Sequence, residues 1–507
     1  MRYDRDSSLP RLVDTMDRRT LLGRGAAMIG GLFAGLSLRS GRAYGQTKPG
    51  AGNPQGDNTW NVVVAGEAMV SRPFSMHKEP EFLSIMKLLR ESDVTYAHLE
   101  MNLGDFEELQ WAAKGNWSGS YMIAEPRIAE DLKWAGVDIM SLAQNHSMDW
   151  GVPGMLSTIK SCKKAGITWA GTGRDLEEAR GPAFVEKDKG RVALLSISSG
   201  NIASEWAGLP KGSIPGRPGI NPLRLSIKYV VDHNAAEQLQ AVGKRLGILR
   251  TSADAPQEFG ITPRTQSGQS DFAFVDGDKF EIQTVGHPKD IEGNLRSIDA
   301  AKQMAEFVMV AHHCNISEGA RGDLPCKFAR AFAKSAVDAG ADIYIGHGWH
   351  KTLGIEIYKN KPLIHGAGNF FAQNEYIQRV PADSFEAYGH DIDQLTTLTP
   401  ATYPLHPGLQ GGDGTWWHSA VFQFRFINKK LTEIRLHPIE MGWDVSGEKP
   451  VRTRPVGTGP HPLTDGVPRM ASGANAQKIL ERIQKLSAAY GTNIEIKDGI
   501  GIARIPV

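Results

Sequence analysis

GADIYIGHGWH, residues 340–350, is the part of this chain from which its architecture can be inferred most directly. An apolar, β-rich run, 342–345, ends on a glycine and is followed by His347 and His350, three residues apart. Neutral imidazole is the commonest side-chain metal ligand, so a strand that ends in two histidines can hold one ion or two neighbouring ions. The alternative is a solvated turn that happens to contain histidines.

Four other apolar runs end in the same way, with oxygen or imidazole donors at their carboxyl ends. Ligands of an open parallel sheet bind outside the carboxyl ends of its strands, so we expect these donors to meet at one edge. The donors are Glu67 after 61–66, His98 and Glu100 at the end of 93–100, Asn145, His146 and Asp149 after 137–144, and His312 and His313 at the end of 307–313.

Strand and helix patterns alternate through most of the chain. Strand, helix, strand at this spacing favours a mostly parallel α/β sheet with right-handed crossovers. An irregular segment over about 201–297 is predicted to be an insertion that contains a hairpin at 271–283. Helices are predicted over 80–93, 126–138, 155–167, 327–341 and 476–491, and an antiparallel hairpin over 419–441 that turns around Asn428.

The N-terminus carries an export pattern. Arg18 and Arg19 precede a mild apolar stretch, 25–38, and a small-residue site, 43–45. This combination predicts a twin-arginine signal over 1–46, recognised by the twin-arginine export machinery, and a linker over 47–59. The expected location is periplasmic or extracellular. The alternative is an uncleaved N-terminal membrane anchor, although the stretch is shorter than the ~20 strongly apolar residues of a spanning helix.

Charge and cysteine content exclude some classes of protein. Lysine and arginine number 57 against 56 acidic residues, a net charge of +1, and no basic block is present, so no nucleic-acid partner is expected. Three cysteines exclude a disulfide framework, although one bond between Cys314 and Cys326 is allowed in an oxidising compartment.

Three blocks in this order resemble those of the CapA family, bacterial proteins of capsule or poly-γ-glutamate synthesis. The blocks are AQNHSMDWG at 143–151, AGADIYIGHGWH at 339–350 and GAGNFF at 366–371. The resemblance runs from about 62 to 371 and continues weakly through the C-terminal hairpin. It implies an α/β fold of the calcineurin-like metallophosphoesterase type, a sandwich with layers α/β/β/α. The domain would span 60–445, and an extension over 446–507 would pack on it.

The resemblance also implies a site for two divalent metal ions, which a mixed oxygen and imidazole shell allows to be Zn, Mn, Fe, Mg or Ca. Glu100 would bridge the two ions. His146, beside a ligand, would protonate a leaving group or stabilise developing charge. The remaining ligands would be Glu67 and His350 on one ion, and Asn145, His313 and His347 on the other.

The chain departs from the family at two of these positions. Glu67 stands where aspartate is usual, and His98 stands where asparagine is usual. His98 can therefore replace that asparagine, add a nitrogen ligand, or hydrogen-bond to a ligand. His312 is a lesser candidate than His313 for the same role.

Three more residues have expected roles outside the ligand set. Asn369 follows a strand and is a candidate for orienting a histidine. Arg72 is a candidate for binding an anionic substrate group, since a guanidinium suits phosphate or carboxylate. Asp149 precedes helix-start signals, so we expect it to be a helix N-cap or a turn residue rather than a ligand.

Three functions are compatible with these features. The first is synthesis or processing of an anionic capsule-type polymer by a two-metal hydrolase, with membrane-associated polymer synthases as partners. The second is general extracytoplasmic hydrolysis of phosphoesters. The third is a non-catalytic scaffold in a polymer-export assembly, because a fold does not fix an activity.

Overall fold

The computed structural model describes residues 59–110, 121–262, 272–318, 322–373, 414–444 and 466–506, together with a few positions between 377 and 452. The predicted signal over 1–46 and all but the last residue of the linker lie outside these ranges. Within them, no helix combines the length and the apolar character of a membrane span.

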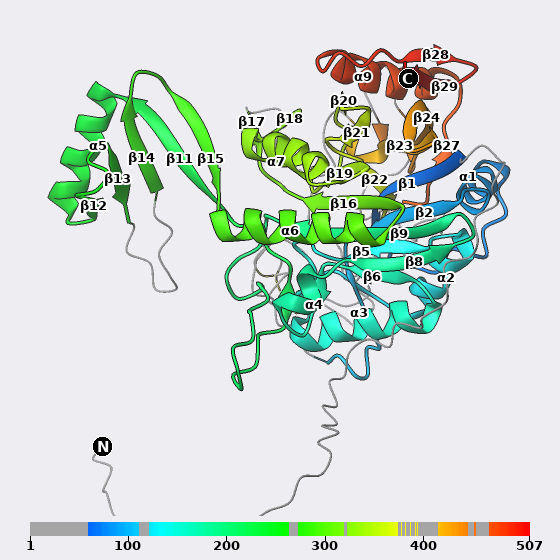
Figure 1. The fold of residues 1–507 in the computed structure, drawn as a ribbon, viewed down its shortest axis with the longest axis horizontal. Helices are drawn as coiled ribbons and strands as arrows, with labels where there is room; N and C mark the ends of the chain where they lie inside the picture. The colour runs from blue at the N-terminus through cyan, green and yellow to red at the C-terminus, as the bar shows by residue number, and fades with distance from the viewer. Residues whose placement is uncertain are drawn as a thin grey trace, which may run out of the picture. The chain divides into compact units, whose positions relative to one another are not determined.

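Two large β-sheets carry the fold (Figure 1). The first has ten strands, of which β1, β2, β5 and β6 run parallel and extend to one edge of the sheet. Its order is β28 (Glu495–Lys497), β29 (Ile500–Arg504), β24 (Lys430–Glu440), β23 (His418–Ile427), β1 (Thr59–Met69), β2 (Val94–Leu99), β5 (Ile139–Ser141) and β6 (Thr168–Ala170), with β22 (Asn369–Ala372) on β1 and β27 (Arg469–Met470) on β24.

The second sheet has six strands, of which β9, β16, β19 and β21 run parallel. Its order is β20 (Ile355–Tyr358), β21 (Lys361–Ile364), β19 (Ile343–His347), β16 (Phe307–His313), β9 (Gly190–Ser198) and β8 (Ala183–Lys187). The five apolar runs that end in donors are thus divided between two sheets: β1, β2 and β5 belong to the first, and β16 and β19 belong to the second.

One apolar cluster joins the two sheets face to face. It contains Val62 of β1 and Tyr96 of β2 from the first sheet, and Met309 of β16 and Ile345 of β19 from the second. Since alternate residues of a strand point to opposite faces, the other face of each sheet remains to be covered by helices.

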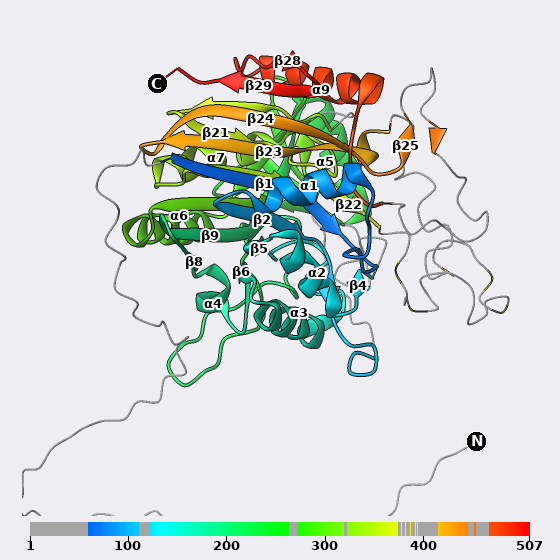
Figure 2. The ribbon, with the colours of Figure 1, turned by 90° about the vertical axis from the view of Figure 1, so that its right-hand side faces the viewer.

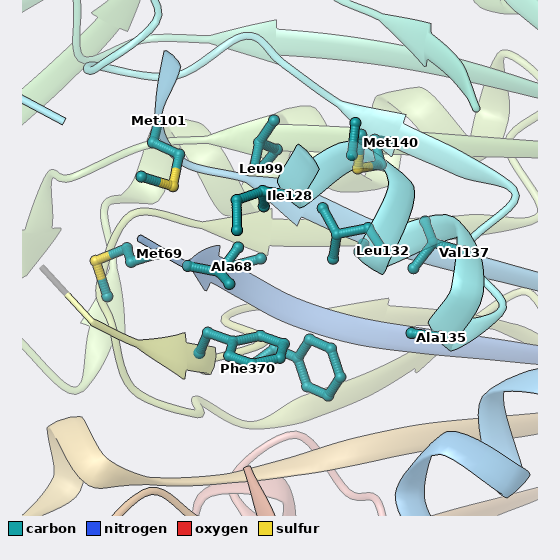
Figure 3. Packing of buried hydrophobic residues seen from close by; sticks show 14 of the residues in the cluster. Ala68, Met69, Leu99, Met101, Ile128, Leu132, Ala135, Val137, Met140 and Phe370 are labelled. Atoms are coloured by element: carbon teal, nitrogen blue, oxygen red, sulfur yellow. The ribbon is translucent and has the colours of Figure 1, made fainter. Parts of the chain in front are cut away.

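Helices cover both outer faces. A second apolar cluster joins α1 and α2 to the first sheet, and a third joins α6 and α7 to the second sheet. Figure 2 shows α1 and α2 in front of β1 and β2, and Figure 3 shows Ile128 and Leu132 of α2 in the cluster with Ala68 and Leu99. These helices are α1 (Pro80–Arg90), α2 (Arg127–Ala135), α3 (Gly151–Ala165), α6 (Pro288–Met304) and α7 (Lys327–Asp338).

β1 changes its neighbouring strand at Glu67, the first of the candidate ligand residues. Its first half pairs with β23, whereas from Glu67 onward it pairs with β22. The change brings Gly66 against Gly368, whose carbonyl oxygen would lie 1.9 Å from a Cβ at position 66, so only glycine fits there. The Glu67 amide donates to that same oxygen at 2.8 Å, which fixes the backbone that carries the Glu67 side chain.

The predicted insertion contains a separate five-stranded sheet, drawn in green in Figure 1. The hairpin predicted at 271–283 is wrong, because β14 and β15 do not pair with each other; both pair with β11, which lies between them. The sheet ends at Gly286, before the expected 297, because α6 already packs on the second large sheet. Its strands are β12 (Leu249–Thr251), β13 (Glu258–Ile261), β14 (Phe272–Gly277), β11 (Leu225–Asp232) and β15 (Glu281–Gly286), with α5 (His233–Leu246) between β11 and β12.

The C-terminal hairpin forms between β23 and β24, with Asn428 and Lys429 at positive φ in its two-residue turn. Beyond it, β29 pairs with β24 and extends the first sheet. The helix α9 (Gly473–Ala488) buries Ile479, Leu480 and Ile483 in the cluster that joins the two large sheets.

We predict that Leu480→Ala lowers the free energy of unfolding by about 2–5 kcal/mol, because it leaves a cavity in a fully buried apolar position. Chemical denaturation of the full chain measures this change. The control is Lys485→Ala on the exposed side of the same helix, for which a change within about 0.5 kcal/mol is expected. Equal stability of the two variants would contradict the packing of α9 described here.

Candidate metal centre

The candidate ligands lie at the carboxyl ends of strands from both sheets. His98 is on β2, His313 and His347 are the last residues of β16 and β19, and Glu100 directly follows β2. His313 and His347 are paired across β16 and β19, so their side chains point to the same face, toward the first sheet. The site therefore lies between the two facing sheets, at the carboxyl ends of their strands.

Glu67, Glu100 and His350 form one group whose ligand atoms all lie within 4.8 Å of one another. Nδ1 of His350 lies 2.7 Å from Oε2 of Glu67, and its Nε2 lies 3.5 Å from Oε1 of Glu100. His350 has a positive φ of 54°, an uncommon backbone conformation for a side chain of this size. Gly348 precedes it and donates its amide to Oε1 of Glu67 at 2.7 Å, which ties this loop to β1.

His98, Glu100 and His313 form a second group within the same distance limit, so Glu100 belongs to both. Nε2 of His313 lies 4.0 Å from Oε1 of Glu100. His347 adjoins the first group, with Nδ1 3.6 Å from Oε1 of Glu67. Five side chains, those of Glu67, His98, His313, His347 and His350, therefore gather around the shared carboxylate of Glu100.

Several polar atoms of these side chains are buried and have no hydrogen-bond partner among the described residues. A buried polar group without a partner costs free energy, and a buried charge costs more. Imidazole nitrogens and carboxylate or amide oxygens are also the ligand atoms that divalent metals accept in proteins. The donor set therefore fits one or more cations. The atoms are both carboxylate oxygens of Glu100, Oδ1 of Asn145, Nε2 of His313 and Nδ1 of His347.

The pKa shifts of these side chains also favour a bound cation. Burial raises the pKa of Glu100 well above its ordinary value, and burial lowers the pKa values of His313 and His347. Burial also lowers the pKa of His350, but Glu100 and Glu67 outweigh it and raise that pKa to about 9. His350 can therefore carry one positive charge beside the two carboxyl groups, whereas the neutral imidazoles of His313 and His347 can ligate a cation, which would supply further positive charge.

His146 lies next to Asn145, in the loop between β5 and α3. Its Nδ1 is 2.7 Å from Oδ2 of Asp149, and the same carboxylate oxygen accepts the Met122 amide at 2.7 Å. Of the two roles expected for Asp149, helix N-cap or turn residue, the structure has the second: Asp149 lies in the turn before α3, whose cap position is Trp150, and its carboxylate contacts His146. Asp149 thereby fixes the ring orientation of His146.

His98 and His312 both have their two ring nitrogens in hydrogen bonds. His98 contacts Oγ of Ser141 at 2.6 Å and Nδ1 of His313 at 3.0 Å. His312 points to the opposite face of β16, where it contacts Tyr344 at 2.7 Å and Ser199 at 2.8 Å. The prediction of His312 as a possible ligand or ligand partner is therefore corrected: it lies outside the group.

Asn369 and Arg72 lie on either side of the end of β1. Asn369 is the residue opposite Glu67 in β22, and its Oδ1 lies 3.0 Å from Nδ1 of His350. Arg72 follows the strand and its backbone amide donates to Gln373 at 3.1 Å. Asn369 is thus placed to orient His350, whereas the Arg72 backbone is held by Gln373, the residue that follows β22.

Three residues that the sequence did not single out support the histidines. The Tyr96 hydroxyl lies 2.8 Å from Nε2 of His347 and 2.5 Å from Oγ of Ser141. The Trp416 ring lies 4.1 Å from the ring of His350, and its carbonyl accepts from Asn369 at 2.9 Å. Tyr96 lies two residues before His98 on β2, so the sequence could have indicated that both side chains point to the same face. Nothing in the sequence links Trp416 to His350.

Comparisons with known proteins give the following similarities. The profile of the family described as "Bacterial capsule synthesis protein PGA_cap" matches residues 61–374. The uncharacterized protein y4sH of Sinorhizobium fredii is 33% identical over 454 residues, which cover 88% of this chain and 93% of that protein. The capsule biosynthesis protein CapA of Bacillus anthracis is 23% identical over 57% of this chain and 53% of that protein. A probable polyglutamine synthesis accessory protein of Mycobacterium tuberculosis is 26% identical over 46% of this chain and 44% of its own length.

We predict that Zn²⁺ raises the melting temperature of chelator-treated protein and that Glu100→Gln abolishes this effect, because Glu100 is shared by both ligand groups. Binding at 100 times the dissociation constant corresponds to about 2.7 kcal/mol of stabilisation. Without metal, Glu100→Gln should unfold no earlier than the wild type, since it removes a buried carboxyl group that has no partner among the described residues. Thermal unfolding with and without Zn²⁺ tests both points, and an equal response of the variant to Zn²⁺ would contradict them.

Proposed function

Since the chain belongs to the family of bacterial capsule synthesis proteins named PGA_cap, we propose that it is an exported, metal-dependent hydrolase that acts in the synthesis or processing of an anionic capsule-type polymer such as poly-γ-glutamate. Membership of this family supports the proposal that the substrate is a capsule-type polymer. The buried, unpartnered ligand atoms of Glu100, Asn145, His313 and His347 support the metal-dependent chemistry, and this is the observation that carries the proposal.

The fold supports the same assignment. Two facing mixed sheets with helices on both outer faces agree with the layers of a calcineurin-like metallophosphoesterase, and we propose that the chain has this fold. The twin-arginine pattern of the N-terminal sequence supports export to the periplasm or the exterior. Polymer synthases at the membrane are the partners that such a location would allow.

We propose that two divalent ions are held by Glu67, Glu100, Asn145, His313, His347 and His350. When bound, the ions would supply Lewis-acid charge that stabilises negative charge on the oxygens of a phosphoester or amide under attack. Glu100 belongs to both ligand groups and is therefore the residue proposed to contact both ions.

His146 is the proposed proton donor to the leaving group. Asp149 accepts a hydrogen bond from Nδ1 of His146 and stabilises the charged imidazolium, so the proton to be donated is on Nε2. Arg72, which lies three residues after the end of β1, is proposed to bind an anionic group of the substrate, which its guanidinium can do with two hydrogen bonds.

The full chain, purified and analysed for metal, should carry two divalent ions and shorten poly-γ-glutamate of defined length. Glu100→Ala and His347→Ala should abolish both properties. His437→Gln, on β24 and hydrogen-bonded to Gln423, is the matched control and should keep them. If the protein released phosphate from an aryl phosphate but did not shorten the polymer, the assigned substrate would be a phosphoester instead of the polymer. Absence of both metal and hydrolysis would overturn the proposed enzyme in favour of a scaffold.

We predict that His146→Ala lowers kcat on the active substrate by about 10²–10⁴-fold while the metal content stays at the wild-type value, because proton donation is lost and the proposed ligands remain. Asp149→Asn should lower kcat in the same direction, since it removes the carboxylate that stabilises the imidazolium. Steady-state kinetics together with metal analysis test this separation. If Asp149→Asn lost its metal, the role of His146 and Asp149 would instead be to hold Asn145 in place.

A further inference from the structure

We propose that Ser141 is the common hydrogen-bond acceptor that determines which ring nitrogen of His347 and which of His313 faces the metal centre. The inference rests on the proposed metal site and adds residues that position its ligands. Ser141 lies on β5 directly opposite His98 of β2 in the parallel register, so the pairing of these strands fixes its place.

A continuous chain of hydrogen bonds joins the two ligand histidines through Ser141. From one end, Nε2 of His347 lies 2.8 Å from the Tyr96 hydroxyl, which lies 2.5 Å from Oγ of Ser141. From the other end, Nδ1 of His313 lies 3.0 Å from Nε2 of His98, whose Nδ1 lies 2.6 Å from the same Oγ. All five side chains are buried.

The direction of these bonds follows from the atoms that remain free. The nitrogens without hydrogen-bond partners in the described part of the chain are Nδ1 of His347 and Nε2 of His313. A neutral imidazole carries its proton on one nitrogen only, so a lone pair on the free nitrogen requires the proton on the other. Nε2 of His347 must then donate to Tyr96, and Nδ1 of His313 must donate to His98.

Each donation dictates the next one. Because the Tyr96 oxygen accepts from His347, its own proton is available to Ser141. Because Nε2 of His98 accepts from His313, the proton of His98 is on Nδ1 and is donated to Ser141 as well. Oγ of Ser141 has two lone pairs and can accept both bonds. The two halves of the chain therefore end on one hydroxyl oxygen.

The opposite direction is incompatible with ligation. If Ser141 donated to Tyr96 and Tyr96 donated to His347, the proton of a neutral His347 would lie on Nδ1, the atom nearest to Glu67, and would exclude a cation from it. Ring stacking holds the same orientation: the rings of His98 and His347 lie 4.2 Å apart at 9°. We infer that His98 orients His313 rather than serving as a ligand, and that the ligating atoms are Nδ1 of His347 and Nε2 of His313.

The first test uses Zn²⁺ alone and full-length protein whose histidines carry ¹⁵N in the ring. In the Zn²⁺-loaded wild type, ¹⁵N chemical shifts should report a protonated Nε2 and a metal-bound Nδ1 for His347, and the reverse for His313. The opposite assignment for either residue would overturn the inference. This measurement needs no variant.

The second test compares Zn²⁺ affinity, measured by competition with a chelating dye, in three variants. Ser141→Ala should weaken binding by about 10–100-fold, because it affects both His347 and His313, and Tyr96→Phe should weaken it by a smaller factor, because it affects His347 only. His98→Asn should weaken binding less than Ser141→Ala does, because its amide oxygen can still accept from His313 although the link to Ser141 is lost.

Tyr344→Phe is the matched control for Tyr96→Phe. It also removes one buried tyrosine hydroxyl that hydrogen-bonds to a histidine, but that histidine is His312 on the other face of β16. Its affinity should equal that of the wild type. Two Zn²⁺ ions bound equally by the wild type, Ser141→Ala and Tyr96→Phe would overturn this inference and leave the proposed function intact, whereas a wild type that binds no Zn²⁺ would overturn the proposed function itself.

Discussion

The burial of two carboxyl groups between facing sheets is the constraint on which the rest of the structure depends. Glu67 and Glu100 are 1% and 0% exposed and lie in one group with His350, and burial lowers the pKa values of the nearby His313 and His347, which disfavours their charged forms. A buried carboxylate without a compensating partner is unfavourable by several kcal/mol. A cation shared between Glu67, Glu100 and the histidines removes this conflict, and a chain without one would retain it. The left-handed backbone of His350 and the close approach of Gly66 to Gly368 are local features that bring these groups together.

Much of the site could be predicted from the sequence, because a strand's carboxyl end is a position that a sequence pattern can locate. The apolar runs before Glu67, Glu100, His313 and His347 identified their strands, and parallel strands bring such ends to one edge. The helices α1, α2, α3, α7 and α9 begin within about four residues of their predicted starts. The division of the runs between two sheets was not visible in the pattern itself, since periodicity reports burial and not the neighbouring strand.

The parts that could not be predicted depend on contacts between distant segments. Ser141 matters because β2 and β5 pair in one register, and Trp416 matters because the chain returns to His350 after a long separation. Asp149 was expected at a helix cap or in a turn and lies in the turn, but the hydrogen bond between its carboxylate and His146 was not foreseen. The hairpin predicted at 271–283 failed because β11 is inserted between two strands that are neighbours in sequence. In each case the outcome depends on a contact in the folded chain that the local sequence pattern does not report.

The central claim is that Glu67, Glu100, Asn145, His313, His347 and His350 share cations. An anomalous difference map from a crystal of the full chain grown with Mn²⁺ or Zn²⁺ tests it most directly. The account predicts two peaks within ligand distance of these side chains, with Glu100 touching both. A map with no peak there, or with peaks only at surface carboxylates, would contradict it.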